Sequence, residues 1–310
     1  MQFPFKLETG REFDVVGFGT NAVDFLIQVP KYPAFNSKVE LTDYVQAAGG
    51  EVATTMVGLQ RLGLNTSYIG RFGDDLAGKI GSTSLADEGV NIDLAEFVKD
   101  TRTQVAFIII DEGTGERTVI WQRESGLSYE ADEAPINILK RASMLHITPH
   151  DVQACISMAV AARENGAVVS VDIDNIFEGV EELMSHVDVL VASAEFPQRF
   201  TGIANQRTAI SAIQDNFGCS VVGVTLGESG SLIRCNGNFI ETAGFAVPGG
   251  CKDTTGAGDA FRVGLLYGML TGKSVEDSAL AANAVAALKC RAVGARTSLP
   301  SRADLEGFLN

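Results

Sequence analysis

One stretch near the C-terminus combines glycines, hydroxyl groups and acidic side chains just before an apolar run. Residues 252–261 read K-D-T-T-G-A-G-D-A-F. The apolar run after Asp259 predicts a buried helix, and the first N–H groups of a helix have no acceptor within it. Gly256, Ala257 and Gly258 place almost no side chain in the way of a ligand, so their amides predict a binding site for an anion.

The carboxylate of Asp259 lies beside this predicted anion site, where it cannot itself bind an anion. Its useful role is to accept a proton from a hydroxyl group that attacks a phosphorus atom held by the amides. The alternative is that Asp259 only caps the helix, because aspartate is favoured at that position. A G-x-G-D pattern alone does not decide between the two interpretations.

Alternating strand and helix patterns predict the scaffold that positions these residues. Residues 13–17 and 66–69 are typical of buried strands, and residues 51–62 and 75–88 are typical of helices that end at a glycine. The same alternation recurs through the second half of the chain. It predicts a mostly parallel sheet covered by helices on both faces, within a single domain that spans residues 1–310.

Two segments depart from this alternation. Residues 37–48 and 102–123 are typical of antiparallel strands, and the second segment forms a hairpin around E-G-T-G-E. Both segments predict one small sheet beside the main one. Such a sheet could act as a lid or as a dimer interface, or it could be decoration without a role.

The helix after Asp259 is expected to lie in the core. Gly264 and Gly268 permit close packing against a neighbour, and Gly272 ends the helix. The next helix begins at Ser274, where S-V-E-D matches a capping box.

Charge and composition restrict the class of partner. The chain has 24 basic and 39 acidic residues and a net charge of −15, which opposes binding to nucleic acid or to an anionic membrane. Its partners are therefore expected to be small molecules. The five cysteines never form C-x-x-C, and the N-terminus lacks the apolar core of a signal peptide, so we expect a cytoplasmic protein without a disulfide framework. The densest apolar run, residues 105–110, is too short to span a bilayer.

Several weaker motifs compete with this interpretation. G-F-G-T-N-A at 17–22 fits a dinucleotide fingerprint, but the extended residues and prolines that follow argue against the required helix. T-G-K-S at 271–274 lacks the first glycine of a P-loop. His146 and His150 are separated by Pro149, which favours ordinary loop histidines over a metal pair. Further candidates with either a site role or a structural role are Asp172, Asp174, Trp121 and Arg123.

The motif D-T-T-G-A-G-D-A-F resembles, residue for residue, the C-terminal signature of the ribokinase-like (PfkB-type) carbohydrate kinases. Other segments resemble this family in the expected order over nearly the whole chain. They are G-F-G-T-N-A-V-D at 17–24, A-G-G at 48–50 with L-Q-R-L-G at 59–63, G-R-F-G-D-D-L-A-G at 70–78 and T-L-G-E-S-G at 225–230.

The resemblance implies a three-layer α/β/α sandwich with a small β-sheet lid, ATP as phosphoryl donor, Mg²⁺, and a sugar-like hydroxyl as acceptor. It implies that Asp259 is the base and that the amides of residues 256–258 form the anion hole. The substrate-side positions are Asp24, Gly49, Gly50 and Thr54. The nucleotide-side positions are Thr225, Gly227, Gly230, Thr255 and Asn283. A homodimer through the exposed small sheet is also expected.

The chain departs from the family pattern in two places. Thr54 stands where the family usually has an asparagine that touches the sugar, which leaves the identity of the substrate open. Around residues 193–196 the usual N-x-x-E is absent and Glu195 is one position off, so the metal ligands stay unassigned. The alternatives are a nucleoside kinase of the same fold and a non-catalytic binding protein.

Overall fold

The computed structural model describes all of residues 1–310, and its main body is built on one eight-stranded sheet. The strand order is β14-β13-β12-β11-β10-β9-β1-β4, in which the last six are mutually parallel and β13 runs antiparallel to both of its neighbours, β12 and β14. The strands are β1 (Phe13–Phe18), β4 (Thr66–Ile69), β9 (Ala142–Ile147), β10 (Val168–Ile173), β11 (Val189–Ser193), β12 (Val221–Thr225), β13 (Ser231–Cys235) and β14 (Asn238–Thr242).

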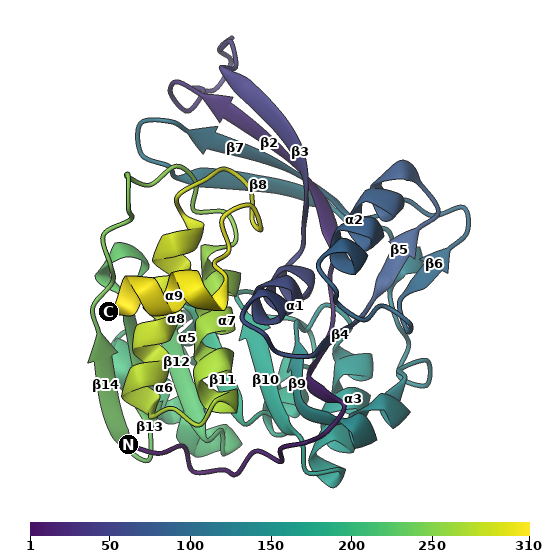
Figure 1. Ribbon diagram of the computed structural model, residues 1–310, viewed down its shortest axis with the longest axis vertical. Helices are drawn as coiled ribbons and strands as arrows, with labels where there is room; N and C mark the ends of the chain where they lie inside the picture. Colours follow the sequence, from purple (N-terminus) through teal and green to yellow (C-terminus); the bar gives the residue numbers. More distant parts are fainter.

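Helices cover both faces of this sheet, which confirms the predicted three-layer α/β/α arrangement. In Figure 1, α1, α7, α8 and α9 lie in front of the sheet, and α3, α5 and α6 lie behind it. Each face has its own apolar core, of 34 and 35 buried residues respectively. The helices are α1 (Glu51–Arg61), α2 (Leu76–Asp87), α3 (Val152–Glu164), α4 (Val180–Met184), α5 (Phe196–Thr201), α6 (Gln206–Phe217), α7 (Ala257–Leu270), α8 (Val275–Lys289) and α9 (Arg302–Leu309).

A separate four-stranded sheet projects from one end of the main body (Figure 1). Its order is β3 (Asp43–Gly49), β2 (Ala22–Val29), β7 (Val105–Asp111) and β8 (Arg117–Gln122), and β7 and β8 form the expected hairpin. Two details differ from the sequence-based expectation. The first of the two expected segments becomes a strand only at Asp43, and β2 is an additional central strand that follows β1 directly. A further pair, β5 (Arg71–Gly73) and β6 (Glu96–Val98), is parallel.

The extended β2 also explains why G-F-G-T-N-A is not a dinucleotide site. The fingerprint requires a helix after its glycines, whereas residues 22–29 pair with β3 and β7 as a strand. The chain instead passes directly from β1 in the main sheet to β2 in the small sheet.

Helix α7 packs closely against α8, as its glycines predicted. A Cβ added to Gly264 would lie 2.5 Å from the carbonyl oxygen of Ala281, and one added to Gly268 would lie 2.3 Å from the Ser278 hydroxyl. Ser274 caps α8 by accepting a hydrogen bond from the Asp277 amide. The close contact with α8 holds the N-terminus of α7 in place at the carboxyl end of the parallel strands.

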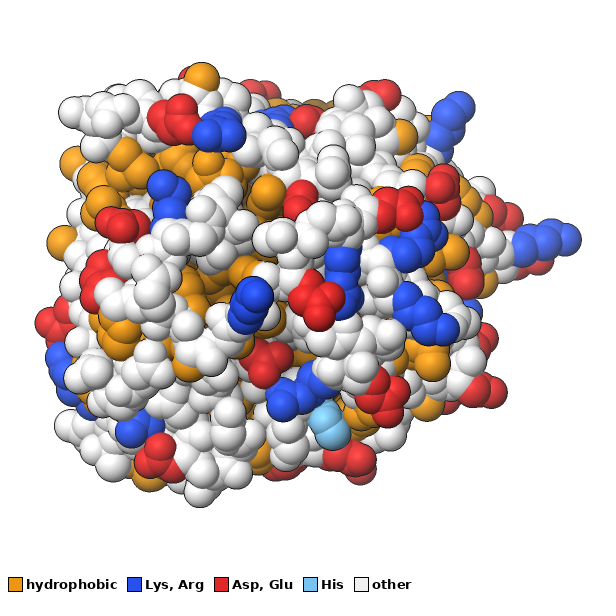
Figure 2. Space-filling model, turned by 60° about the horizontal axis from the view of Figure 1, so that its bottom comes forward, with side chains coloured by type: hydrophobic (Ala, Val, Ile, Leu, Met, Phe, Trp, Pro, Cys, Tyr) orange, Lys and Arg blue, Asp and Glu red, His pale blue; other side chains and the backbone are white.

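The molecular surface carries charged side chains of both signs (Figure 2). Acidic and basic side chains are interspersed over the face drawn in Figure 2, and no continuous basic patch is visible there. None of the helices combines the length and the apolar character that crossing a membrane would require.

Candidate active site

The N-terminus of α7 presents free backbone donors, as expected for an anion site. Gly256 is the N-cap residue and has a φ of 75°, a conformation that favours glycine. The amides of Gly256, Gly258 and Asp259 have no acceptor in the protein, whereas the Ala257 amide donates to the Thr254 carbonyl oxygen at 3.0 Å. The donors available to a ligand are therefore those of residues 256, 258 and 259, and Ala257 instead closes the turn.

Asp259 belongs to a cluster of carboxyl groups at the ends of β10 and α1. Asp172 at the end of β10 pairs with the buried guanidinium of Arg262, which also donates to the Val191 carbonyl oxygen at 2.7 Å. Burial and the neighbouring Glu51 carboxylate together raise the pKa of Asp259 to about 7. Burial likewise raises the pKa of Asp172 to about 8 and that of Glu51 above its usual value. The cluster therefore retains protons near neutral pH and titrates as a unit.

These raised pKa values predict how the stability of the ligand-free protein depends on pH. The unfolded chain releases the protons of Asp259 and Asp172 near pH 4, whereas the folded protein keeps them up to about pH 7 and about pH 8, so the free energy of unfolding falls as the pH rises from about 4 to about 8. Asp259→Asn removes one such group. Thermal unfolding of the ligand-free variant should give a Tm about 2–4 °C above the wild type at pH 8 and nearly equal to it close to pH 4, where the unfolded chain also keeps the proton. An equal shift at both pH values would contradict the assignment.

Asp24 faces this cluster from the small sheet. It lies on β2, is 4% exposed, and burial raises its pKa to about 6. The adjacent β3 strand ends at Gly49, where an added Cβ would lie 2.0 Å from the Asp24 Oδ2 atom. Gly50 follows with a φ of 89°, and its Cβ would lie 2.4 Å from the Asn21 Cα atom. Both glycines are required for the position of the Asp24 carboxyl group.

A buried arginine that the sequence did not single out lies on the same side. The guanidinium of Arg296 donates to the Gly49 carbonyl oxygen, to the Thr54 Oγ1 atom at 3.3 Å and to the Ser84 Oγ atom at 3.0 Å. Thr54 has no exposed surface. Its hydroxyl therefore orients Arg296 and does not itself face the cleft.

The nucleotide-side positions divide into two groups. Thr225 and Gly227 line a cleft of about 560 Å³, together with Ser193, Ala194, Glu195, Leu226 and Ser229. This volume is typical of small-molecule sites. Gly230 packs against the Thr242 carbonyl oxygen, and Asn283 donates to the Ser231 Oγ atom at 3.0 Å, so both support the neighbouring strands.

Thr255 directly precedes Gly256, the N-cap residue of α7. Its amide donates to the Asp253 Oδ1 atom at 2.7 Å, and its buried hydroxyl has no partner in the protein. A bound phosphate would satisfy that hydroxyl.

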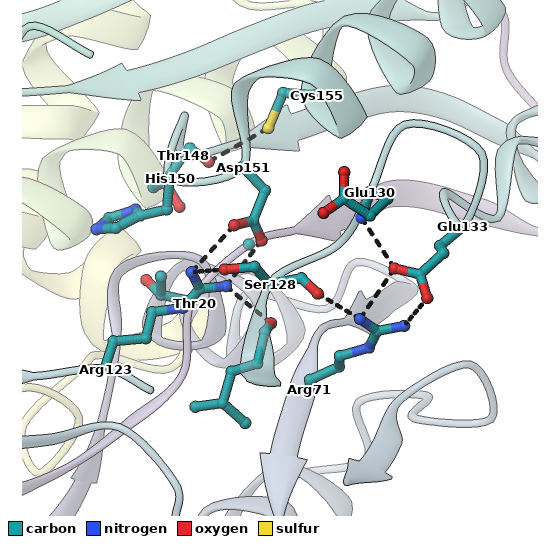
Figure 3. A network of polar contacts seen from close by, with 12 residues as sticks. Thr20, Arg71, Arg123, Ser128, Glu130, Glu133, Thr148, His150, Asp151 and Cys155 are labelled. Carbon is teal, nitrogen blue, oxygen red and sulfur yellow. Dashed lines mark hydrogen bonds and ion pairs between the residues drawn. The ribbon is translucent and has the colours of Figure 1, made fainter. Parts of the chain in front are cut away.

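The remaining candidates have structural roles. His146 lies on β9, not in a loop as expected, and burial lowers its pKa to about 3, so it is neutral. Figure 3 shows Arg123 held by Asp151 through two hydrogen bonds of 2.7 and 3.0 Å, and by Ser128. Arg123 is therefore fixed in a structural ion pair and is not free to close over a ligand.

His150 belongs to an aromatic group at the edge of the site. Its ring contacts Trp121 edge-on at 6.0 Å and Phe177 at 5.2 Å between centroids. Its Nδ1 atom lies 3.9 Å from the Glu51 Oε2 atom, but burial lowers the pKa of His150 to about 4, so the ring is neutral. The group offers apolar surface next to the carboxyl cluster.

Sequence reasoning did not assign three residues of this site. Glu51 directly follows the Gly49-Gly50 pair and is the first residue of α1. Its place next to that glycine motif could have indicated a site residue. Asp253 lies within the 252–261 motif but received no role. Arg296 comes from a loop 247 residues after Gly49, and nothing local to either residue indicates their contact.

The sequence is similar to known carbohydrate and nucleoside kinases over most of its length. A model of the pfkB family of carbohydrate kinases matches residues 13–302. A fructokinase of Escherichia coli is 30% identical over 283 residues, which cover 83% of this chain and 90% of the fructokinase. A nucleoside kinase of Methanothermobacter thermautotrophicus is 25% identical over 296 residues, which cover 94% of each protein.

The fold has close counterparts among solved structures. The structure of Arabidopsis thaliana ribokinase complexed with ribose and ATP superimposes with a TM-score of 0.81 and a sequence identity of 24%. The alignment covers 96% of this chain and 99% of the ribokinase. The likeness shows that the main sheet, its two helical layers and the small sheet are arranged as in a ribokinase fold.

Proposed function

The chain belongs to the pfkB family of carbohydrate kinases, and on that premise we propose that it transfers a phosphoryl group from ATP to a hydroxyl of a small sugar or sugar-like alcohol. The observation that carries this proposal is the group of unpaired amides at residues 256, 258 and 259, adjacent to the Asp259 carboxyl group. Kinases of this family use ATP.

In the proposed reaction, Asp24 holds the acceptor through its hydroxyl groups. The Asp259 carboxylate takes the proton from the attacking hydroxyl, whose oxygen forms a bond to the γ-phosphorus as the bond to the β-phosphate oxygen breaks. The free amides at the start of α7 stabilise the negative charge on the transferred group. ADP then leaves through the cleft beside Thr225 and Gly227.

We also propose that the nucleotide binds as its Mg²⁺ complex. No group of three or more His, Cys, Asp or Glu side chains is arranged to hold a metal ion alone. Mg²⁺ bound to nucleotide phosphates usually needs only one or two carboxylates and keeps several waters. Asp172 and Glu51 supply such oxygen donors, and a divalent cation would neutralise part of the charge that their cluster concentrates.

A nucleoside is the second candidate acceptor. The neutral aromatic group of Trp121, His150 and Phe177 lies beside Glu51 and offers an apolar slot in which a base could stack. The matched nucleoside kinase supports this alternative. A protein that binds ligands without turnover would have no need for Asp259 beside the free amides.

An ADP-release assay with Mg²⁺-ATP tests the proposal. The panel should contain ketoses, aldoses, sugar acids and nucleosides, each at several concentrations. Turnover on a sugar-type acceptor is the expected result, and preference for a nucleoside would establish the second candidate. ATP binding without turnover across the whole panel would favour the non-catalytic binder.

We further propose that the protein is located in the reducing cytoplasm, where its five free cysteines remain thiols. We also propose that two copies of the chain associate through the outer face of the small sheet. Phe25, Phe107 and Ile120 form one row across three strands on the face opposite to Asp24, and the two phenylalanine rings stack at 5.0 Å. Phe107 is 45% exposed and Ile120 is 56% exposed. An apolar face of this kind is typical of an interface.

The association predicts that Phe107→Glu yields a monomer. Light scattering coupled to size exclusion should give twice the chain mass for the wild type and one chain mass for the variant. Leu76→Glu, at a more exposed apolar residue outside the sheet, is the control and should remain dimeric. A wild-type protein that elutes as a monomer would refute the dimer.

A further inference from the structure

A lysine without any exposed surface lies behind the turn that leads to Asp259. Lys289 is the last residue of α8, and its Nζ atom donates to the Asp253 carbonyl oxygen at 2.8 Å. The same Nζ atom lies 3.7 Å from the Asp253 Oδ2 atom, and both side chains are 0% exposed. A fully buried ion pair is costly to desolvate, so its presence here calls for a role other than surface solubility.

The carboxylate of Asp253 is itself bonded on both oxygens. Its Oδ1 atom accepts from the Thr255 amide at 2.7 Å, and its Oδ2 atom accepts from the Gly294 amide at 2.8 Å. Asp253 is thus held through three oxygen atoms. The turn at residues 254–256, which places the free amides of α7, starts from this fixed point.

The Lys289–Asp253 pair is also connected to the acceptor side of the site, through the loop at residues 290–298. The Lys289 carbonyl oxygen accepts from the Ser298 hydroxyl, and the Gly294 amide donates to Asp253, so the far end and the middle of the 290–298 loop are both attached to the pair. That loop carries Arg296, which contacts the Gly49 carbonyl oxygen and Thr54. The loop that orients the acceptor site and the turn that forms the anion hole therefore share one anchor.

We propose that Lys289 is a positioning residue for phosphoryl transfer, which holds the 253–256 turn and the Arg296 loop in register through Asp253. Lys289 does not touch either substrate. Its ammonium group holds the Asp253 backbone carbonyl and faces the Asp253 carboxylate, so that the amides and the acceptor meet at the reacting distance. The inference rests on the proposed function for its kinetic consequence, but the structural anchoring is testable without turnover.

The first test measures this anchoring by amide hydrogen exchange in ligand-free protein. Lys289→Met keeps the length of the side chain and removes its charge, and Lys289→Ala leaves space for a small amine. In both variants, exchange should become faster at residues 254–259 and 290–297 and stay unchanged in α3. Added methylammonium should restore slow exchange in Lys289→Ala and have no effect on the wild type. Unchanged exchange in the two segments would overturn the inference.

The second test is kinetic and uses the acceptor that the panel identifies. Because misplacement of reacting groups by about 1 Å costs roughly a hundredfold, Lys289→Ala should lower kcat by about thirty- to a hundredfold. The KM for the acceptor should rise through the displaced Arg296, the Kd for ADP should stay within a factor of about two, and methylammonium should restore part of kcat. Lys273→Met, at an exposed lysine, should match the wild type.

The outcomes separate the two claims. A wild-type protein that phosphorylates no acceptor refutes the proposed function, while the exchange experiment still decides the anchoring. A variant that loses activity only in proportion to its loss of folded protein, with an unchanged acceptor KM and no rescue by methylammonium, would reduce Lys289 to a stability residue and refute the positioning role.

Discussion

Asp259→Asn should lower kcat by about a thousandfold, because general-base catalysis contributes roughly 10²–10⁴ and the amide cannot accept the proton. The variant retains the shape of the side chain and the free amides at the start of α7. The Kd for ADP should therefore change little. Rapid-quench or coupled kinetics on the accepted substrate, with ADP affinity from calorimetry, would measure both quantities.

A matched control separates this effect from a loss of charge alone. Asp132→Asn removes a carboxylate from an exposed position far from α7 in the sequence and should leave kcat unchanged. Asp259→Asn should also raise the Tm at pH 8, so low activity would occur in a more stable protein. Equal kcat values for Asp259→Asn and the wild type would remove Asp259 from the role of base.

Gly49→Ala should reduce kcat/KM for the acceptor by about a hundredfold or more, because the loss of a buried charged hydrogen bond to a substrate hydroxyl has an effect of that order. The added Cβ would lie 2.0 Å from the Asp24 Oδ2 atom, so the carboxyl group must move from its present position. The loss should appear mainly in the acceptor KM. The cleft at Thr225 is formed by other elements, so ADP binding should be retained.

Gly307→Ala is the control for this substitution. A Cβ at Gly307 would meet no atom within 4 Å, and the residue lies in α9. Its kinetics should match those of the wild type. An unchanged acceptor KM in Gly49→Ala would show that Asp24 does not hold the acceptor.

Where the sequence pattern is local, it predicts the fold well. The apolar strand runs, the glycines after α1 and α2 and the hairpin at residues 112–116 all depend on neighbours in the chain, and each appears in the structure. Gly264 and Gly268 in α7 likewise predict the close contact with a neighbouring helix, which is α8 in the structure. Strand β3 begins later in the structure than the sequence pattern predicted, because residues 38–42 have β-prone side chains but make no strand pairing.

The site could be predicted only in part, because its geometry depends on contacts between distant residues. The 252–261 motif alone leads to the proposed anion hole and the proposed base, because both lie within one turn of the chain. The sequence does not show that the Ala257 amide is used within that turn. The contacts of Arg296 with Gly49 and of Lys289 with Asp253 span 247 and 36 residues, and no spacing rule indicates them.

The carboxyl cluster illustrates the cost of building such a site. Glu51, Asp172 and Asp259 are brought together by three separate elements, and burial raises each pKa, with a further contribution from neighbouring carboxylates. A sequence shows three acidic residues far apart, each of which would be ordinary on a surface. Only the packing of α1 and α7 against the end of β10 brings these three carboxyl groups into one cluster with shifted pKa values.

The most direct measurement of the central claim is the product balance of a single reaction with the accepted substrate, followed by phosphorus NMR and mass spectrometry. The account predicts one ADP for each acceptor that gains a phosphoryl group on a hydroxyl oxygen, with both products formed about a thousandfold more slowly in Asp259→Asn. Formation of ADP and free phosphate without a phosphorylated acceptor would contradict it, because the attacking group would then be water.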